Sequence, residues 1–169
     1  ALAFDKPVVV AGAGESLESQ VSFLRERRDD IRIAAVDTAL PVLLASGIRP
    51  DLIVAAEAQF ANLRDFAGLK DWNVSVAADI LSYPPVLRRF TGKRYVFTSR
   101  FADLRWFERS GVRDFLPPFI PPLGSVGVMA LYLAAAGSHP RMPIFLAGLD
   151  LSYVPGKSPA RGAPSPPST

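Results

Sequence analysis

Short apolar runs alternate with stretches of helical periodicity, and this alternation constrains the fold more than any other feature of the chain. The runs at 8–11, 31–36 and 144–147 have the length of buried parallel strands. Between the first two, residues 17, 21 and 24 are spaced for the inner face of a helix. Such alternation indicates βαβ units. We therefore predict a Rossmann-like α/β domain with three layers, α/β/α, and a mainly parallel sheet.

The same patterns place the individual elements. We expect strands at 7–11, 31–36, 52–56, 74–78, 94–98 and 143–149, and helices at 16–28, 38–45, 61–68, 86–90, 101–109 and 125–136. Four prolines interrupt residues 115–122, which we expect to form a loop or an edge crossing. Residues 1–153 are predicted to be one domain, a fragment of a longer protein. Residues 154–169 are rich in Pro, Gly and Ser and are expected to be a flexible tail.

The composition of the chain limits which binding partners and which cellular location we expect. The mean hydropathy is +0.21, but no apolar run approaches the roughly 20 residues of a membrane-spanning helix, so we expect no membrane partner. The net charge of +3 is dispersed, and its densest basic cluster, at residues 25–28, has no interleaved aromatic side chains, so we expect no nucleic acid. The absence of cysteine, with a single histidine, argues against catalytic zinc. No secretory signal begins the chain, which favours a cytoplasmic location.

Polar residues follow directly after the predicted strands. Right-handed crossovers bring the carboxyl ends of parallel strands to one edge of the sheet, where open α/β folds bind their ligands. We expect a functional site at that edge, built from Gly12 to Ser16, Asp37, Thr38, Glu57, Gln59, Asp79, Ser99 and Asp150.

Gly12 and Gly14 lie between the first strand and its helix, where the helix N-terminus could hold a phosphate. Leu17 stands where a dinucleotide fingerprint has its third glycine. The alternative is a tight turn in which Ser16 or Glu15 caps the helix. A phosphate-binding loop of the G-x-x-x-x-G-K-[ST] type is absent.

The other candidate positions also allow two interpretations. Asp37 either binds a ribose or caps the next helix. Glu57, with Gln59, either binds a metal, hydroxyl or base, or is solvated. The pair 124–125, Gly-Ser, precedes an apolar helix and is either an anion or sugar pocket or a plain N-cap. Asp150 has no following helix to cap, which favours a functional role.

Four segments together resemble a known family: VVVAGAGESLE at 8–18, the AVDTAL…GIRPD stretch at 35–51, GSV at 124–126 and LAGLDLSY at 146–153. They are similar to the Rossmann domain of bacterial motility accessory factors, glycosyltransferases proposed to put nonulosonic sugars on flagellin. The same superfamily includes archaeal 6-hydroxymethylpterin diphosphokinases and is similar to bacterial sialyltransferases. The resemblance extends to about residue 157.

The resemblance implies a nucleotide-activated sugar, a CMP-sugar, as donor and a serine or threonine of flagellin as acceptor. It further implies binding roles for Gly12, Gly14, Ser16, Leu17, Asp37, Thr38, Gln59, Gly124 and Ser125, and it makes Glu57 and Asp150 the candidate catalytic residues.

Three departures keep other functions open. Glu15 stands where the family has proline, Glu57 where it has aspartate, and Ser158 where a histidine often follows Gly-Lys. One alternative is a pterin diphosphokinase that uses ATP and Mg²⁺, although residues 55–59 offer a single carboxylate to a cation that prefers several oxygen ligands. Another is a degenerate nucleotide-binding module without activity. No metal ligand is assigned.

Overall fold

The computed structural model describes residues 1–99 and 116–150 of the chain. Within them, seven strands form one sheet in the order β6-β5-β4-β3-β2-β1-β7, and every neighbouring pair is parallel. The strands are β1 (Val8–Ala11), β2 (Arg32–Val36), β3 (Leu52–Ala55), β4 (Ser75–Asp79), β5 (Arg94–Ser99), β6 (Phe119–Ile120) and β7 (Ile144–Ala147). The predicted Rossmann-like α/β fold is confirmed.

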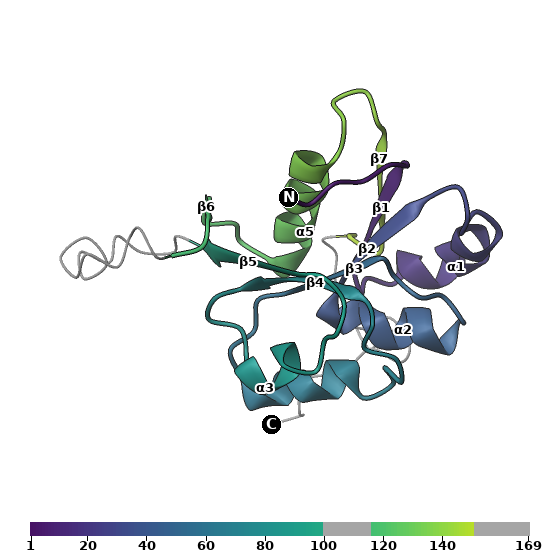
Figure 1. Ribbon diagram of the computed structural model, residues 1–169. Coiled ribbons are helices and arrows are strands. Elements are labelled where there is room, and N and C mark those ends of the chain that lie inside the picture. Colours follow the sequence, from purple (N-terminus) through teal and green to yellow (C-terminus); the bar gives the residue numbers. More distant parts are fainter. Residues whose placement is uncertain (100–115, 151–169) are drawn as a thin grey trace.

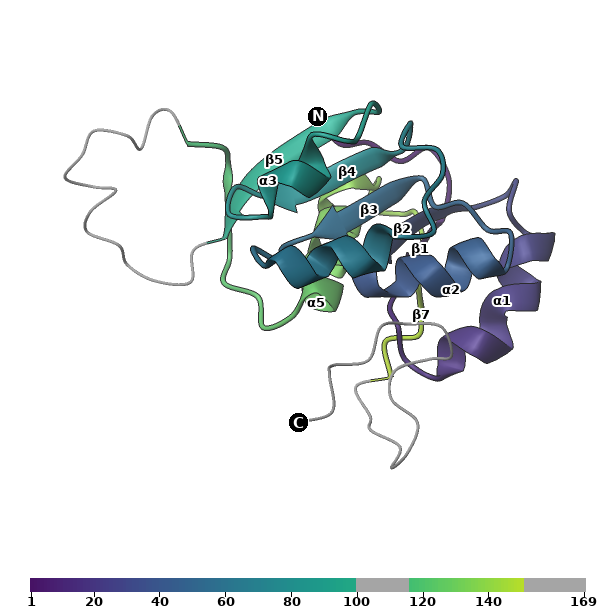
Figure 2. The ribbon, with the colours of Figure 1, turned by 90° about the horizontal axis from the view of Figure 1, so that it is seen from below.

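Helices cover both faces of the sheet, as Figures 1 and 2 show. One face carries α1 (Ser16–Glu26), α2 (Leu40–Ala45), the 3₁₀ helix η2 (Phe60–Phe66) and α3 (Pro84–Leu87), whereas α5 (Val126–Gly137) lies on the other. A short 3₁₀ turn, η1 (Asp37–Ala39), precedes α2. The chain advances from β1 to β5 in one direction and returns through α5 to place β7 beside β1, so the single returning helix covers the opposite face.

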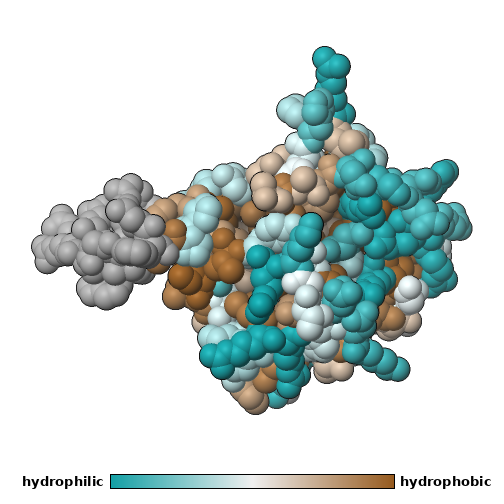
Figure 3. All heavy atoms as spheres, in the orientation of Figure 1, coloured by the Kyte–Doolittle hydropathy of each residue, from teal (hydrophilic) through white to brown (hydrophobic). Residues whose placement is uncertain are grey.

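Burial explains the apolar strands. All residues of β1 and β3 are buried, because helices pack on both sides of the middle of the sheet. The two ends of the sheet are less covered: Phe145 and Leu146 of β7, and Val96 and Phe119 near β6, are exposed. Figure 3 shows hydrophobic side chains at the surface where β5 and β6 lie. No described helix is both long and apolar enough to cross a membrane.

The structure adjusts several expected elements. The helix expected at 61–68 is the 3₁₀ helix η2, and the helix expected after a Pro84-Pro85 start, through residues 86–90, begins at Pro84 and ends earlier, at Leu87. The proline-rich 115–122 stretch contains β6, a two-residue edge strand. β7 ends at Ala147 because Gly148 has a φ of 62°. The expected helix at 101–109 and the expected tail at 154–169 lie outside the described residues.

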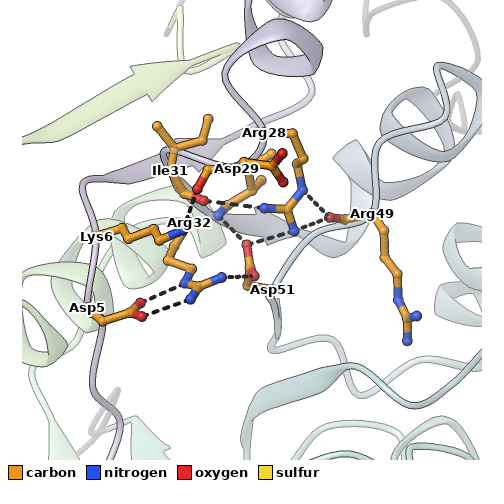
Figure 4. A network of polar contacts seen from close by, with 9 residues as sticks. Asp5, Lys6, Arg28, Asp29, Ile31, Arg32, Arg49 and Asp51 are labelled. Atoms are coloured by element: carbon orange, nitrogen blue, oxygen red, sulfur yellow. Dashed lines mark hydrogen bonds and ion pairs between the residues drawn. The ribbon is translucent and has the colours of Figure 1, made fainter.

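A charged network lies at the amino edge of the sheet (Figure 4), where Asp5, Arg32 and Asp51 also line a pocket of about 760 Å³. The Arg32 guanidinium donates to both carboxylate oxygens of Asp5, at 2.7 and 2.9 Å. It also contacts Asp51, which forms a second ion pair with Arg28. These residues lie at the opposite edge from the predicted site, so we interpret the network as structural.

Candidate functional site

A pocket of about 550 Å³ opens at the carboxyl edge, between the ends of β1, β2 and β3 and the N-terminus of α5. Gly12 comes from the end of β1, and Glu57 comes from the segment after β3. The pocket brings together six of the predicted site residues: Gly12, Asp37, Thr38, Glu57, Gly124 and Ser125. The other described residues that line it are apolar, and none of the described lining residues is Lys, Arg or His.

Asp37 is the most unusual group in this pocket, because its carboxylate is almost fully buried, with 1% of the residue exposed. Oδ1 accepts a 2.9 Å bond from the backbone N–H of Thr38, and Oδ2 accepts a 2.8 Å bond from Nδ2 of Asn62. Burial raises the pKa of Asp37 to about 6, and the charges of Asp65 and Glu57 add to this, while the two hydrogen bonds oppose it.

Asn62 and Asp65 were not predicted from the sequence. Both are buried on η2, and Nδ2 of Asn62 also donates to Oδ2 of Asp65 at 3.1 Å. Burial also raises the pKa of Asp65. The available signal was their i, i+3 spacing, which places two polar side chains on one face of a helical turn. That signal is weak, because polar residues in a short helix usually face solvent.

The glycine turn is bonded to the end of β7. The N–H of Gly12 donates to Ala147 O at 2.8 Å, and the N–H of Gly14 donates to Gly148 O at 2.7 Å. The N–H of Ser16 donates to Oδ2 of Asp150 at 2.9 Å, and the Ser16 hydroxyl donates to Oδ1.

Asp150, which follows β7 and lies 134 residues from Ser16 in the sequence, therefore caps the N-terminus of α1. The expectation that no helix accounts for Asp150 was wrong, because the cap comes from tertiary rather than local structure. The carboxylate takes the position that an anionic ligand would occupy at this helix end. Leu17 is fully buried and packs beneath the turn.

The N-terminus of α5 is the helix end that faces the pocket. Ser125 caps it, since its Oγ accepts a 3.2 Å bond from the Val128 N–H, so the N-cap interpretation is confirmed. The first turn of a helix still has further N–H groups without intrahelical partners and carries partial positive charge. A Cβ atom added to Gly124 would meet nothing within 4 Å, so this side of the pocket is open.

Glu57 lines the pocket but is exposed, and its carbonyl accepts a 2.9 Å bond from the Tyr83 N–H. Asp79 is buried outside the pocket and accepts a 2.8 Å bond from the Ser99 N–H. Gln59 is exposed at the N-cap position of η2 and does not line the pocket. In the described ranges, no three His, Cys, Asp or Glu side chains are grouped so that they could hold a metal ion.

Comparisons with known proteins cover nearly the whole chain. The family model described as 6-hydroxymethylpterin diphosphokinase MptE-like matches residues 2–156. A protein of Treponema pallidum (strain Nichols), described as uncharacterized, is 34% identical over 159 residues, or 94% of this chain and 28% of that protein. A second protein of that organism, with the same description, is 38% identical over 52 residues, which are 31% of this chain and 25% of that protein.

One solved structure, of the MAf glycosyltransferase from Magnetospirillum magneticum AMB-1, shares the fold. The TM-score is 0.70 at 22% identity, with 92% of this chain and 24% of that chain covered. The chain thus spans about a quarter of the length of the proteins that it resembles.

Proposed function

The chain belongs to the 6-hydroxymethylpterin diphosphokinase MptE-like family, and from that premise we propose that it is the nucleotide-binding domain of a glycosyltransferase. The donor is a nucleotide-activated sugar of the CMP-nonulosonic acid type, and the acceptor is a serine or threonine hydroxyl of a flagellin-like protein. The fold shared with the MAf glycosyltransferase supports this choice.

The charge of the pocket is the observation that carries the proposal. Among the described residues that line the pocket, Asp37 and Glu57 are charged and none is basic, so this part of the pocket suits a ligand that offers many hydroxyl and amino donors and few negative charges. A CMP-nonulosonic acid, which carries the charges of one phosphodiester and one sugar carboxylate, fits this description better than a triphosphate, which carries more. The Asp37 carboxylate accepts bonds from the ribose hydroxyls, and the positive end of α5 holds the single phosphate.

The transfer itself is a displacement at the anomeric carbon. The acceptor oxygen forms the new glycosidic bond while the bond from that carbon to the phosphate oxygen breaks, and CMP leaves with the bonding electrons. A base takes the proton of the acceptor hydroxyl. We assign this base to Glu57, which lines the pocket and is exposed, rather than to Asp150, whose carboxylate is bonded to Ser16.

Pyrophosphoryl transfer from ATP to a pterin is the second candidate, favoured by the description of the family. That reaction uses Mg²⁺, which prefers several oxygen ligands. The described part of the chain holds no cluster of three suitable side chains, so the residues present do not fit the cation and we derive no step through it. A nucleotide-binding module without catalytic activity is the third candidate.

Calorimetric titration of the chain with CMP, CDP, ATP and GTP tests the proposal. We expect CMP to bind and ATP to bind at least about tenfold more weakly, because the triphosphate adds charge beside two carboxylates. Gly124→Leu should reduce CMP binding by about tenfold or more by filling the pocket. Gly124→Ala is its matched control, since the added Cβ meets nothing within 4 Å.

The outcomes separate the candidates. Binding of ATP in preference to CMP, with Mg²⁺-dependent release of AMP in the presence of a hydroxymethylpterin, would replace the proposal by the second candidate. CMP binding by a protein that releases no CMP from a CMP-sugar when acceptor is present would favour the inactive module. If none of the four nucleotides binds, the proposal fails.

A further inference from the structure

Asn62 joins the Asp37 carboxylate of the pocket to a second buried acid, Asp65. Its side-chain amide has two N–H donors on one nitrogen. That nitrogen lies 2.8 Å from Oδ2 of Asp37 and 3.1 Å from Oδ2 of Asp65. All three residues are buried, with Asn62 and Asp65 only 5% and 7% exposed. The Asn62 amide therefore donates both of its hydrogens to buried carboxylates, those of Asp37 and Asp65.

Within residues 1–99 and 116–150, the side-chain charges that act on Asp37 are both negative. Asp65 faces it from η2 and Glu57 from the segment after β3, while α5 has no charged residue and presents only its partial positive end. Two carboxylates so close together cannot both ionise readily unless a donor stands between them. The Asn62 amide is that donor, and its bonds to Asp37 and Asp65 favour the ionised form of each.

The amide also fixes the direction of the Asp37 carboxylate. Thr38 N–H holds one oxygen and Asn62 holds the other. A carboxylate has about four lone-pair sites; these two bonds use two of them, and Asp37 is among the residues that line the pocket. We propose that Asn62 is a positioning residue, which keeps the Asp37 carboxylate ionised and oriented to accept hydrogen bonds from the hydroxyl groups of a ribose. This inference rests on the proposed function.

The test follows the titration of Asp37 and the binding of cytidine from about pH 5 to about pH 8. Cytidine carries the ribose hydroxyls but no phosphate. A phosphate group would obscure the result, because its own pKa is about 6. Carbon NMR of the Asp37 carboxyl group reports its protonation without any ligand. Asn62→Leu is compared with Asp65→Asn, which removes a charge but leaves the amide of Asn62 in place.

The two variants should move the titration in opposite directions. Asn62→Leu should raise the Asp37 midpoint by about one unit and weaken cytidine binding near pH 6 by about fivefold, since a donor to the carboxylate is lost. Asp65→Asn should lower the midpoint by removing a neighbouring negative charge. Asn62→Ser, which keeps one hydroxyl donor, should restore part of the loss. Circular dichroism of each variant confirms folding.

The possible failures are distinct. An unchanged Asp37 midpoint in folded Asn62→Leu, or shifts of the same sign in Asn62→Leu and Asp65→Asn, would overturn the inference. If Asn62→Leu does not fold, the direction of the Asp65→Asn shift and the behaviour of Asn62→Ser decide it. If cytidine and CMP do not bind the wild-type chain at any pH, the proposed function fails, while the NMR titration still reports whether Asn62 controls Asp37.

Discussion

At the scale of single residues, Asp37 shows most clearly how a functional site conflicts with stability. Its carboxylate is held in a buried position beside Asp65, with two hydrogen bonds to offset the loss of water. Because the pKa is raised to about 6 in the folded state from an ordinary value of 3.8, ionised Asp37 destabilises the fold. The binding role that we propose for Asp37 would use this charge.

The stability of the protein should therefore fall as the pH rises through this interval. Between about pH 4 and about pH 6 the folded state binds the proton that the unfolded state has lost, so the free energy of unfolding decreases with pH. Asp37→Asn removes this dependence. We expect the stability of the variant minus that of the wild type to rise by about 2 to 3 kcal/mol from about pH 4 to about pH 7 in urea unfolding.

Asp30→Asn is the control, because the Asp30 side chain is 67% exposed and only its surface pair with Arg27 is lost. Its difference from wild type should stay nearly constant over the same range. If the difference in stability between Asp37→Asn and the wild type is equally independent of pH, the Asp37 charge does not destabilise the fold.

Gly14 is constrained by packing rather than by backbone conformation. A Cβ atom at this position would lie 2.5 Å from Oδ2 of Asp150 and 2.7 Å from Gly148 O. We expect Gly14→Ala to lower the free energy of unfolding by about 2 kcal/mol or more, because the turn and the end of β7 must separate. Gly124→Ala, which meets nothing within 4 Å, should change it by less than about 0.5 kcal/mol. Equal effects of the two substitutions would contradict this account.

At the scale of elements, the regular strands and α1 could be predicted because their patterns are local. The apolar runs of β1 and β2 have the length of strands buried on both faces, and Leu17 and Leu24 mark the inner face of α1. The 3₁₀ form of η2 could not be predicted, since the period of its few polar residues suits either helix type. The pairing of Asn62 with Asp37 depends on how η2 folds back on η1, which no local pattern encodes.

The candidate site, like the elements, could be predicted only in part. The rule that ligands bind at the carboxyl ends of parallel strands correctly brought Gly12, Asp37 and Glu57 to one pocket. The position of Asp150 follows instead from the alignment of β7 beside β1, which fixes its carboxylate at the N-terminus of α1. Sequence patterns do not reveal which strand lies next to β1.

We therefore expect Asp150 to affect the free energy of unfolding rather than the binding of CMP. We expect Asp150→Ala to lower the free energy of unfolding by about 1 to 2 kcal/mol, because α1 loses its cap and the Ser16 N–H loses its partner. CMP affinity measured by calorimetry on the folded variant should stay within about twofold, since Asp150 is not among the residues that line the pocket. A loss of CMP binding without a loss of stability would instead place Asp150 in the binding site.

At the scale of the whole molecule, the two edges of the sheet have different roles. The carboxyl edge carries the pocket that Asp37, Glu57 and the N-terminus of α5 line, whereas the Arg32 network of Figure 4 lies at the amino edge. The first residues of the chain belong to that second edge. The Phe4 N–H donates to Gly137 O at 2.8 Å, and Leu2 and Phe4 pack against the C-terminal end of α5. This segment therefore joins the α5 layer to the sheet.

Removal of residues 1–5, compared with a single substitution of Asp5, should show how much apolar packing and the ion pair of this segment each contribute to the stability of the fold. We expect the truncated chain to lose about 2 to 4 kcal/mol in urea unfolding, because the apolar contacts of Leu2 and Phe4 and the backbone bond to Gly137 disappear together. Asp5→Asn alone removes only the exposed ion pair with Arg32, and should have a small effect that vanishes in high salt. If Asp5→Asn matches the truncation, charge rather than apolar packing fastens α5 to the sheet.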